Sequence, residues 1–172
     1  PEEVVEFLNQ YMTRMVNCVN ATRGVVDKYI GDAIMAVWGA PVTTGNDTEN
    51  AIDAALAMRR ELLLFNEGRG GDRKPVIKIG CGINTGPVLA GQIGSEERME
   101  YTVVGNTINL TSRYCDAAAP GTILVSPEIY QRLHYCLDVE HPPLEVETKH
   151  EGPIKAYVVR GWKGGRPAGK EG

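Results

Sequence analysis

Apolar residues recur every three or four positions in two long segments of the chain, the spacing of a helix with one buried face. In residues 2–22 they are Val4, Val5, Leu8, Tyr11, Met12, Met15, Val16 and Val19. In residues 47–63 they are Ala51, Ile52, Ala55, Leu56, Met58, Leu62 and Leu63. We therefore predict two amphipathic helices, the first ended by Gly24 and the second capped by Asp47, a residue type common at helix starts.

Between these helices, residues 25–30 and 33–38 are rich in β-branched and aromatic side chains around Gly31-Asp32, the pattern of a β-hairpin. The rest of the chain alternates short apolar runs with turn residues. It predicts further strands at 77–79, 81–83, 88–90, 101–104, 123–125, 139, 144–146 and 156–159, and helices at 106–117 and after Pro127. Helices mixed with antiparallel hairpins predict an α+β sandwich, with flanking helices over a central, mainly antiparallel sheet.

The chain has 172 residues, enough for one domain with a full core. We assign residues 1–160 to this domain and residues 161–172, which are rich in glycine, to a tail or linker. The net charge of −4 argues against broad binding to nucleic acid. No apolar run approaches the ~18 residues that a membrane span needs.

The four cysteines are scattered through the chain and form no CxxC or Cys/His cluster. A zinc site is therefore not expected, and reduced thiols in a cytoplasmic domain are the simplest interpretation.

The segment VDKYIGDAIMAVW, residues 26–38, contains two candidate site residues. Asp32 at the hairpin tip is either an ordinary turn residue or a ligand for a hard cation such as Mg²⁺. In a regular strand, Lys28 lies on the same face as Ile30 and on the opposite face from Asp27. Its ammonium group either extends to water along the strand or donates to a ligand.

A second candidate is GNTINLTSR, residues 105–113, in which Asn109 and Arg113 lie on one face of the predicted helix. Arginine can bind phosphate oxygens through two hydrogen bonds and asparagine adds a neutral donor and acceptor, but both also suit a solvated helix face. The preceding residues, including Thr102 and Val103, would place a hydroxyl and backbone groups at the helix entrance. Lys149 is a third basic candidate, although loop lysines are common.

Three segments together carry a more specific signal: VDKYIGDAIMAVWGAP, IKIGCGINTGPVLAGQIGSEERMEYTVVGNTINLTSR and AAPGTILVS. In this order, over residues 5–160, they resemble the class III nucleotidyl cyclase catalytic domain. The resemblance implies a ferredoxin-like α+β fold and a head-to-tail homodimer with two composite sites. It implies attack of a ribose 3′-hydroxyl on the α-phosphate of the same nucleotide, with release of pyrophosphate. Two divalent cations, Mg²⁺ or Mn²⁺, held by two aspartates of one protomer, would assist this step.

The resemblance also implies roles for individual residues. Asp32 matches the second metal-binding aspartate. Lys28 matches the lysine that recognises the purine base, and Thr102, followed by Val103, occupies the partner position. A Lys/Thr pair favours ATP, whereas guanylyl cyclases usually have Glu and Cys there. The threonine variant also resembles a subclass that often responds to bicarbonate.

Three further residues match positions that hold the rest of the nucleotide. Asn109 matches the asparagine that positions the ribose, and Arg113 the arginine that stabilises charge on the reacting phosphate. Lys149 lies near a triphosphate-binding lysine, although Thr148-Lys149 stands where the family has Lys-Gly.

One departure concerns the first metal-binding aspartate, which the family carries on a strand before the first helix. Here the sequence begins almost at that helix. We therefore expect a fragment of a longer cyclase with sensor or regulatory domains upstream, whose parent protein is free or attached to a membrane. The alternatives to an adenylate cyclase are a guanylate cyclase and a non-catalytic module that dimerises and binds nucleotide.

Overall fold

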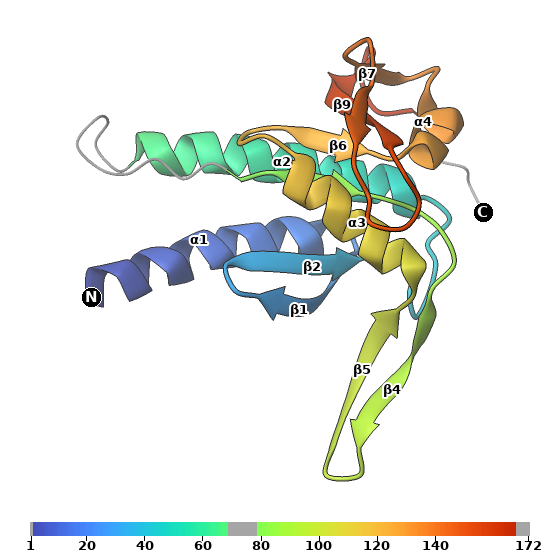
Figure 1. Ribbon diagram of the computed structural model, residues 1–172. Helices are drawn as coiled ribbons and strands as arrows, with labels where there is room; N and C mark the ends of the chain where they lie inside the picture. Colours follow the sequence, from blue (N-terminus) through green and yellow to red (C-terminus); the bar gives the residue numbers. More distant parts are fainter. Residues whose placement is uncertain (1, 69–78, 168–172) are drawn as a thin grey trace.

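The computed structural model of the chain describes residues 2–68 and 79–167 (Figure 1). The helices are α1 (Glu2–Ala21), α2 (Asp47–Glu67), α3 (Asn106–Ala117) and α4 (Pro127–Leu133). The strands are β1 (Val25–Ile30), β2 (Ala33–Val37), β3 (Cys81–Ile83), β4 (Leu89–Ser95), β5 (Arg98–Val104), β6 (Ile123–Val125), β7 (Leu137–Val139), β8 (Leu144–Val146) and β9 (Ile154–Trp162). The fold class is α+β, as predicted.

Five strands form the central sheet, in which β3 pairs with β6 in parallel and β6, β7 and β8 pair with β9 in antiparallel fashion. β6 lies between β3 and β9 and is fully buried. Its side chains alternate between faces, as a strand requires. Ile123 and Val125 pack in a cluster with residues of α2 and α4, whereas Leu124 packs with Tyr114 of α3. Helices therefore cover both faces of the sheet.

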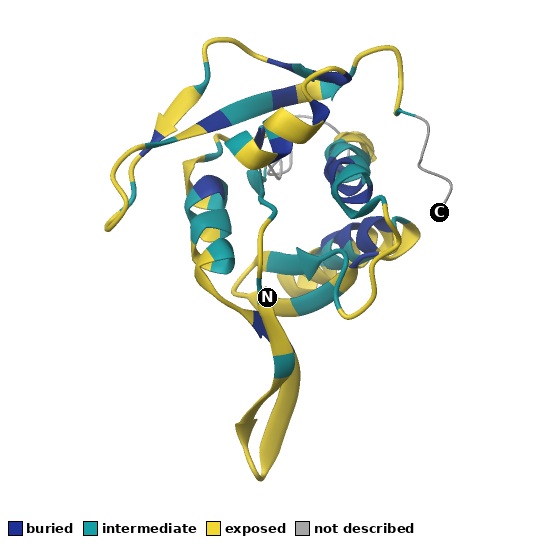
Figure 2. Cartoon of the chain, turned by 90° about the vertical axis from the view of Figure 1, so that its right-hand side faces the viewer, coloured by how far each residue is buried: buried dark blue, intermediate teal, exposed yellow. Residues whose placement is uncertain are grey.

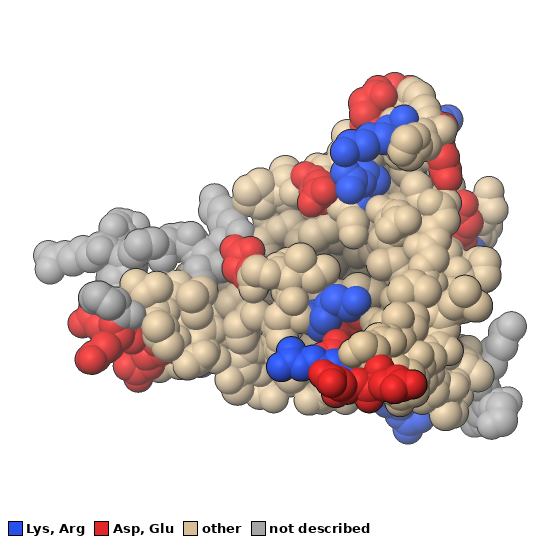
Figure 3. Space-filling view, turned by 60° about the horizontal axis from the view of Figure 1, so that its bottom comes forward, with Lys and Arg blue, Asp and Glu red and all other residues tan. Residues whose placement is uncertain are grey.

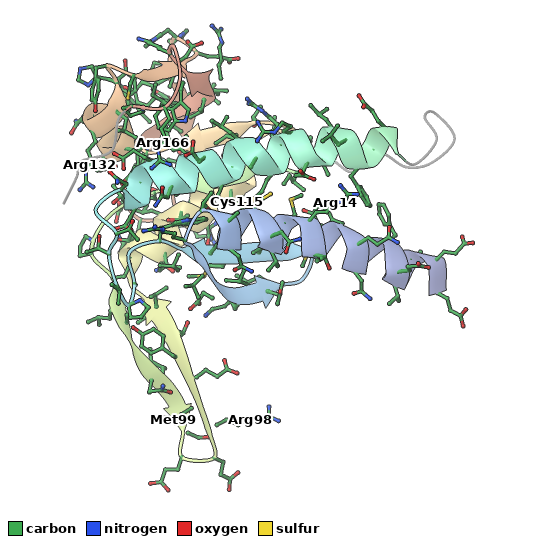
Figure 4. The ribbon with its side chains drawn as sticks, turned by 180° about the vertical axis from the view of Figure 1, so that it is seen from behind. Arg14, Arg98, Met99, Cys115, Arg132 and Arg166 are labelled. Carbon is green, nitrogen blue, oxygen red and sulfur yellow. The ribbon has the colours of Figure 1, made fainter. Side chains whose placement is uncertain are left out.

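A close approach brings α3 onto β3. A Cβ atom at Gly82 would lie 2.4 Å from the backbone nitrogen of Cys115, so only glycine fits at this point of β3. On the other side of the molecule, α1 packs along α2 through Tyr11, Met15, Leu62 and Phe65. Arg14 of α1 lies against α2 and pairs with Glu61 at 3.2 Å (Figure 4).

The remaining strands form two separate hairpins, so the strands make three sheets and not one. β1 and β2 form the predicted hairpin, whose turn contains Gly31 with a φ of +61°. β4 and β5 form an arm that extends away from the body (Figure 1) and is exposed along most of its length (Figure 2). It is longer than predicted, because most of GSEERME continues the strands and only Glu96 and Glu97 form the turn.

Three local expectations need correction or lie outside the described residues. Asn46, not Asp47, is the N-cap of α2, and the Asp47 carboxylate instead accepts hydrogen bonds from Thr43 and Thr44. The expected tail begins at residue 161, whereas β9 continues to Trp162. Most of the strand expected at 77–79 lies outside the described residues.

The last residue of β9, Trp162, and Arg166 shortly after it contact the first half of α2. The indole Nε1 of Trp162 donates to Oδ1 of Asp53 at 2.8 Å, and Arg166 pairs with Oδ2 of the same aspartate at 2.6 Å (Figure 4). Arg166 also donates to the side-chain oxygen of Asn50 at 2.7 Å.

Candidate functional site

The first part of the candidate site is built around a β-bulge in β1. The pairing with β2 steps from Val26–Ala36 directly to Lys28–Met35, which leaves Asp27 as the extra residue. A bulge interrupts the alternation of side chains and redirects them. The Lys28 ammonium therefore lies 3.5 Å from Oδ2 of Asp27, although regular alternation predicts the two side chains on opposite faces.

Thr102 of β5 reaches the same carboxylate from another hairpin. Its hydroxyl donates a hydrogen bond to Oδ2 of Asp27 at 2.8 Å. Thr102 is 9% exposed and the Asp27 side chain 7%, whereas the Lys28 side chain is 44% exposed. The structure thus brings Lys28 and Thr102 together through one buried carboxylate, with the lysine open to solvent.

Sequence reasoning did not select Asp27 as a site residue. One signal was available, because aspartate is depleted in strands and here interrupts a β-branched run. Val103, the neighbour of Thr102, is 3% exposed and pairs with Ala90 of β4, so its side chain is part of the packing.

The second part of the candidate site lies on α3, which follows β5 directly. Asn109 is exposed on this helix, and Arg113 follows one turn later with its side chain 42% exposed. Arg113 pairs with Asp116 at 3.9 Å on the same surface, a contact weak enough to exchange for a ligand. The start of α3 is fixed by Thr107, which donates to the backbone oxygen of Pro87 at 2.7 Å.

Lys149 lies exposed in the loop between β8 and β9. Within this loop, the Thr148 hydroxyl donates to the backbone oxygen of Gly152 at 2.6 Å and accepts from the Glu151 backbone N–H at 3.1 Å. The Glu151 carboxylate then accepts from the side chain of Asn106 at 2.8 Å. Because Asn106 is the first residue of α3, the loop that carries Lys149 is tied to the helix that carries Asn109 and Arg113.

Asp32 lies exposed at the turn between β1 and β2. Burial, with a contribution from the charge of Asp32, raises the pKa of Tyr11 to about 12. In residues 2–68 and 79–167, no group of three or more His, Cys, Asp or Glu side chains is arranged to hold a metal ion. Asp32 thus offers a single carboxylate ligand, which Mg²⁺ accepts when substrate phosphates supply further oxygens.

The surface charge is mixed on the face seen in Figure 3, where lysine and arginine side chains lie among aspartates and glutamates. Such a surface does not favour a polyanion, in line with the negative net charge. None of the helices in the described parts of the chain is long and apolar enough to cross a membrane.

These features define a nucleotide cyclase domain: residues 1–161 match the model of the adenylate and guanylate cyclase catalytic domain, and the chain belongs to this family. Among curated relatives, Adenylate cyclase 1 of Rhizobium meliloti is 36% identical over 113 residues, which are 66% of this chain and 17% of that protein. The uncharacterized protein Rv1320c of Mycobacterium tuberculosis is 40% identical over 128 residues, 73% of this chain and 21% of that protein. The chain thus spans about a fifth of the length of these relatives.

Solved structures of both nucleotide specificities resemble the chain. The guanylyl cyclase Cya2 superimposes with a TM-score of 0.86 at 32% identity, covering 95% of this chain and 83% of that one. The adenylyl cyclase CyaB from P. aeruginosa gives a TM-score of 0.84 at 29% identity, covering 92% of this chain and 83% of that one. The guanylate cyclase domain of RhGC from Catenaria anguillulae, solved with GTP, gives 0.83 at 27% identity, covering 95% and 86%. The likeness establishes the cyclase fold and leaves the choice of base to the site residues.

Proposed function

We propose that this domain is an adenylate cyclase, which converts ATP to 3′,5′-cyclic AMP and pyrophosphate. Family membership supports the reaction class. The observation that carries the choice of ATP is the meeting of the Lys28 ammonium and the Thr102 hydroxyl on one carboxylate oxygen of Asp27.

The hydrogen-bonding groups of the two purines explain why this pair suits adenine. Adenine presents the N1 acceptor beside the N6 amino donor, whereas guanine presents an N1–H donor beside the O6 acceptor. An ammonium can only donate, and a threonine hydroxyl can accept. Lys28 would therefore donate to N1 of adenine while Thr102 accepts from N6, and both contacts would be mismatched with guanine.

The other residues act on the sugar and the phosphates. In the proposed reaction the ribose 3′-oxygen bonds to the α-phosphorus, the bond from this phosphorus to the bridging oxygen breaks, pyrophosphate leaves, and the hydroxyl proton is released. Asn109 orients the ribose for this attack, and Arg113 donates to the α-phosphate as its negative charge is redistributed. Lys149, held next to α3 by the Glu151–Asn106 bond, would neutralise the departing phosphates.

Asp32 is the residue of this chain that would hold a divalent cation. Such cations supply charge neutralisation at the triphosphate and lower the pKa of the attacking hydroxyl. Asp32 follows Lys28 by four positions. The three residue steps from Lys28 to Gly31 span roughly 10 Å at about 3.3 Å per strand residue. This separation fits a composite site in which Asp32 of one protomer serves the nucleotide bound by Lys28 of the other.

The arm formed by β4 and β5 supports the proposed homodimer. Its exposed apolar side chains are Leu89, Ile93, Met99, Tyr101 and Val104. By the pairing register, Leu89, Ile93 and Val104 lie on one face of the arm and Met99 and Tyr101 on the other. Large apolar side chains left exposed on an extended hairpin suit burial by a partner. A head-to-tail partner would cover the arm and complete both composite sites.

The proposal is tested by measuring cyclic AMP and cyclic GMP formation by the full-length protein with ATP or GTP, in Mg²⁺ and in Mn²⁺, with and without bicarbonate. We expect cyclic AMP from ATP with a strong preference over GTP. Cyclic GMP as the main product would establish the guanylate cyclase alternative, which the likeness to Cya2 favours. Nucleotide binding without either product would indicate a non-catalytic module.

A further inference from the structure

The reaction proposed above leaves one buried charged group without a task. The Asp27 side chain is 7% exposed and touches both groups assigned to base recognition: the Thr102 hydroxyl at 2.8 Å and the Lys28 ammonium at 3.5 Å. The bulge in β1 places it there, because it interrupts the alternation that would direct Asp27 away from Lys28. Burying a carboxylate is costly unless it is paired, so this arrangement calls for an explanation.

We propose that Asp27 is a positioning residue that determines the nucleotide preference by fixing the direction of the Thr102 hydrogen bond. This inference rests on the proposed function, in which Lys28 and Thr102 face the purine base. A hydroxyl group has one hydrogen and two acceptor lone pairs, whereas an ionised carboxylate only accepts. The Thr102 hydrogen is therefore committed to Asp27, and only acceptor positions remain for a ligand.

An acceptor at this position distinguishes the two purines. It receives the N6 amino group of adenine, and it repels O6 of guanine, which is itself an acceptor. Without Asp27, the threonine hydroxyl could rotate and donate to O6, so threonine alone would discriminate poorly. Because the Asp27 carboxylate takes the hydroxyl hydrogen, Thr102 cannot donate it to O6 of guanine.

Asp27 also holds the lysine in place. The Lys28 ammonium forms an ion pair with Oδ2 of Asp27 at 3.5 Å, and its half-exposed N–H groups stay available to a ligand. Since one oxygen holds both groups, donor and acceptor lie side by side, as N1 and N6 of adenine require. A hydrogen bond to an ionised group is roughly twice as strong as a neutral one, so the carboxylate holds the Thr102 hydroxyl firmly and draws the Lys28 ammonium toward it.

The test is Asp27→Asn in the full-length protein, because asparagine has nearly the same shape but can donate to Thr102. The measurements are kcat and KM for ATP and for GTP, together with displacement of a fluorescent ATP analogue by each nucleotide, which needs no turnover. We expect the ATP-to-GTP ratio of kcat/KM to fall by about 10- to 100-fold, the scale of one well-placed base contact. The fall arises from a higher KM for ATP, while kcat at saturating ATP stays within a few fold.

A matched control is Asp47→Asn. Asp47 also accepts from threonine hydroxyls, those of Thr43 and Thr44, but in the loop before α2. Its substitution removes an Asp–Thr interaction of the same kind, so it is expected to lower stability and leave the ATP-to-GTP ratio unchanged.

A double-mutant cycle separates positioning from packing. Thr102→Val removes the hydroxyl and keeps the shape, so Asp27→Asn in that background is expected to change the ratio by less than it does in the wild type, because only its effect through Lys28 remains. If Asp27→Asn does not fold, Asp27→Glu and Asp27→Gln form a second pair of equal length. The glutamate variant is expected to keep more of the preference for ATP than the glutamine variant.

An unchanged ATP-to-GTP ratio in Asp27→Asn, or additive effects in the cycle, would overturn the role of Asp27. The proposed function would still stand if the wild type forms cyclic AMP. A wild type that forms no cyclic nucleotide would refute the proposed function alone. In that case the displacement measurements still test the role of Asp27. The inference is supported if the wild type prefers ATP and Asp27→Asn does not. It is overturned if the wild type shows no preference for ATP, or if Asp27→Asn keeps the preference.

Discussion

The central sheet and the two hairpins differ sharply in how much of their surface they bury. In β6 the three residues are between 0% and 2% exposed. On the arm, by contrast, Leu89 is 74% exposed and Met99 52%. The hairpins nevertheless carry Asp32, Lys28 and Thr102, three of the candidate site residues. The region that gives the fold its stability is therefore largely separate from the region to which we assign the recognition of substrate and partner.

The largest effect in this comparison is expected for Leu124→Ala in the middle of β6. Leu124 is fully buried against Tyr114, Val146 and Ala156, so its truncation leaves a cavity. The free energy of unfolding should fall by about 2–5 kcal/mol, as measured by urea denaturation. Leu89→Ala on the arm is the matched control and should change it by less than about 0.5 kcal/mol. Equal losses for both leucines would remove the distinction between the two regions.

The next effect is expected for Arg113→Ala on α3, which should lower turnover by about 10²–10³-fold, the value typical of one donor to a reacting oxyanion. Because its pair with Asp116 is exposed, the unfolding midpoint should hardly move. Arg160→Ala is the control. Arg160 is also exposed and pairs with Glu140 at 3.7 Å, but it is not one of the candidate site residues. Initial rates of cyclic AMP formation would show the difference, and an unchanged rate in Arg113→Ala would remove its catalytic role.

A smaller effect is expected for the double substitution Lys28→Glu with Thr102→Cys. It replaces the donor at position 28 by an acceptor and the acceptor at position 102 by a thiol donor. The preference should therefore shift toward GTP by about 10- to 100-fold in kcat/KM. Glutamate beside Asp27 also places like charges together, and a modest loss of stability should accompany the shift. Competition between ATP and GTP in one assay measures the preference. An undiminished preference for ATP would contradict the assignment of Lys28 and Thr102.

The smallest effect on stability is expected for Met99→Asp on the distal part of the arm (Figure 4). The free energy of unfolding should change by less than about 0.5 kcal/mol, since the side chain is exposed. Self-association should weaken, because a charge would enter the proposed interface, and sedimentation velocity over a range of concentrations measures this. Met99→Leu is the control, and equal association of both variants would exclude the arm from the interface.

The periodicity of the sequence predicted the helices well, because their buried faces repeat over many residues. Helix α1 was expected over 2–22 and runs from Glu2 to Ala21, and α3 was predicted at its observed bounds. The length of the arm was missed because its strands pair through backbone hydrogen bonds and bury few side chains. The contacts of Trp162 and Arg166 with Asp53 were missed because they join residues more than 100 positions apart.

The candidate site was predicted in part. The resemblance selected Lys28 and Thr102, and the structure brings them together. It did not select Asp27, since strict alternation assigned this residue to the other face of β1, and an aspartate within a β-branched run does not by itself reveal a bulge. The base-recognition roles of Lys28 and Thr102, the metal-binding role of Asp32 and the roles of Asn109, Arg113 and Lys149 stay predictions.

The bulge in β1 has a consequence for how this domain can change over time. A bulge depends on the number of residues in a strand and not on their identity. Loss of Tyr29 would restore a regular strand and turn Asp27 and Lys28 to opposite faces, although both residues would be retained. If Asp27 has the proposed role, strand length is an inheritable determinant of nucleotide choice, and a comparison of related domains by residue identity alone would overlook it.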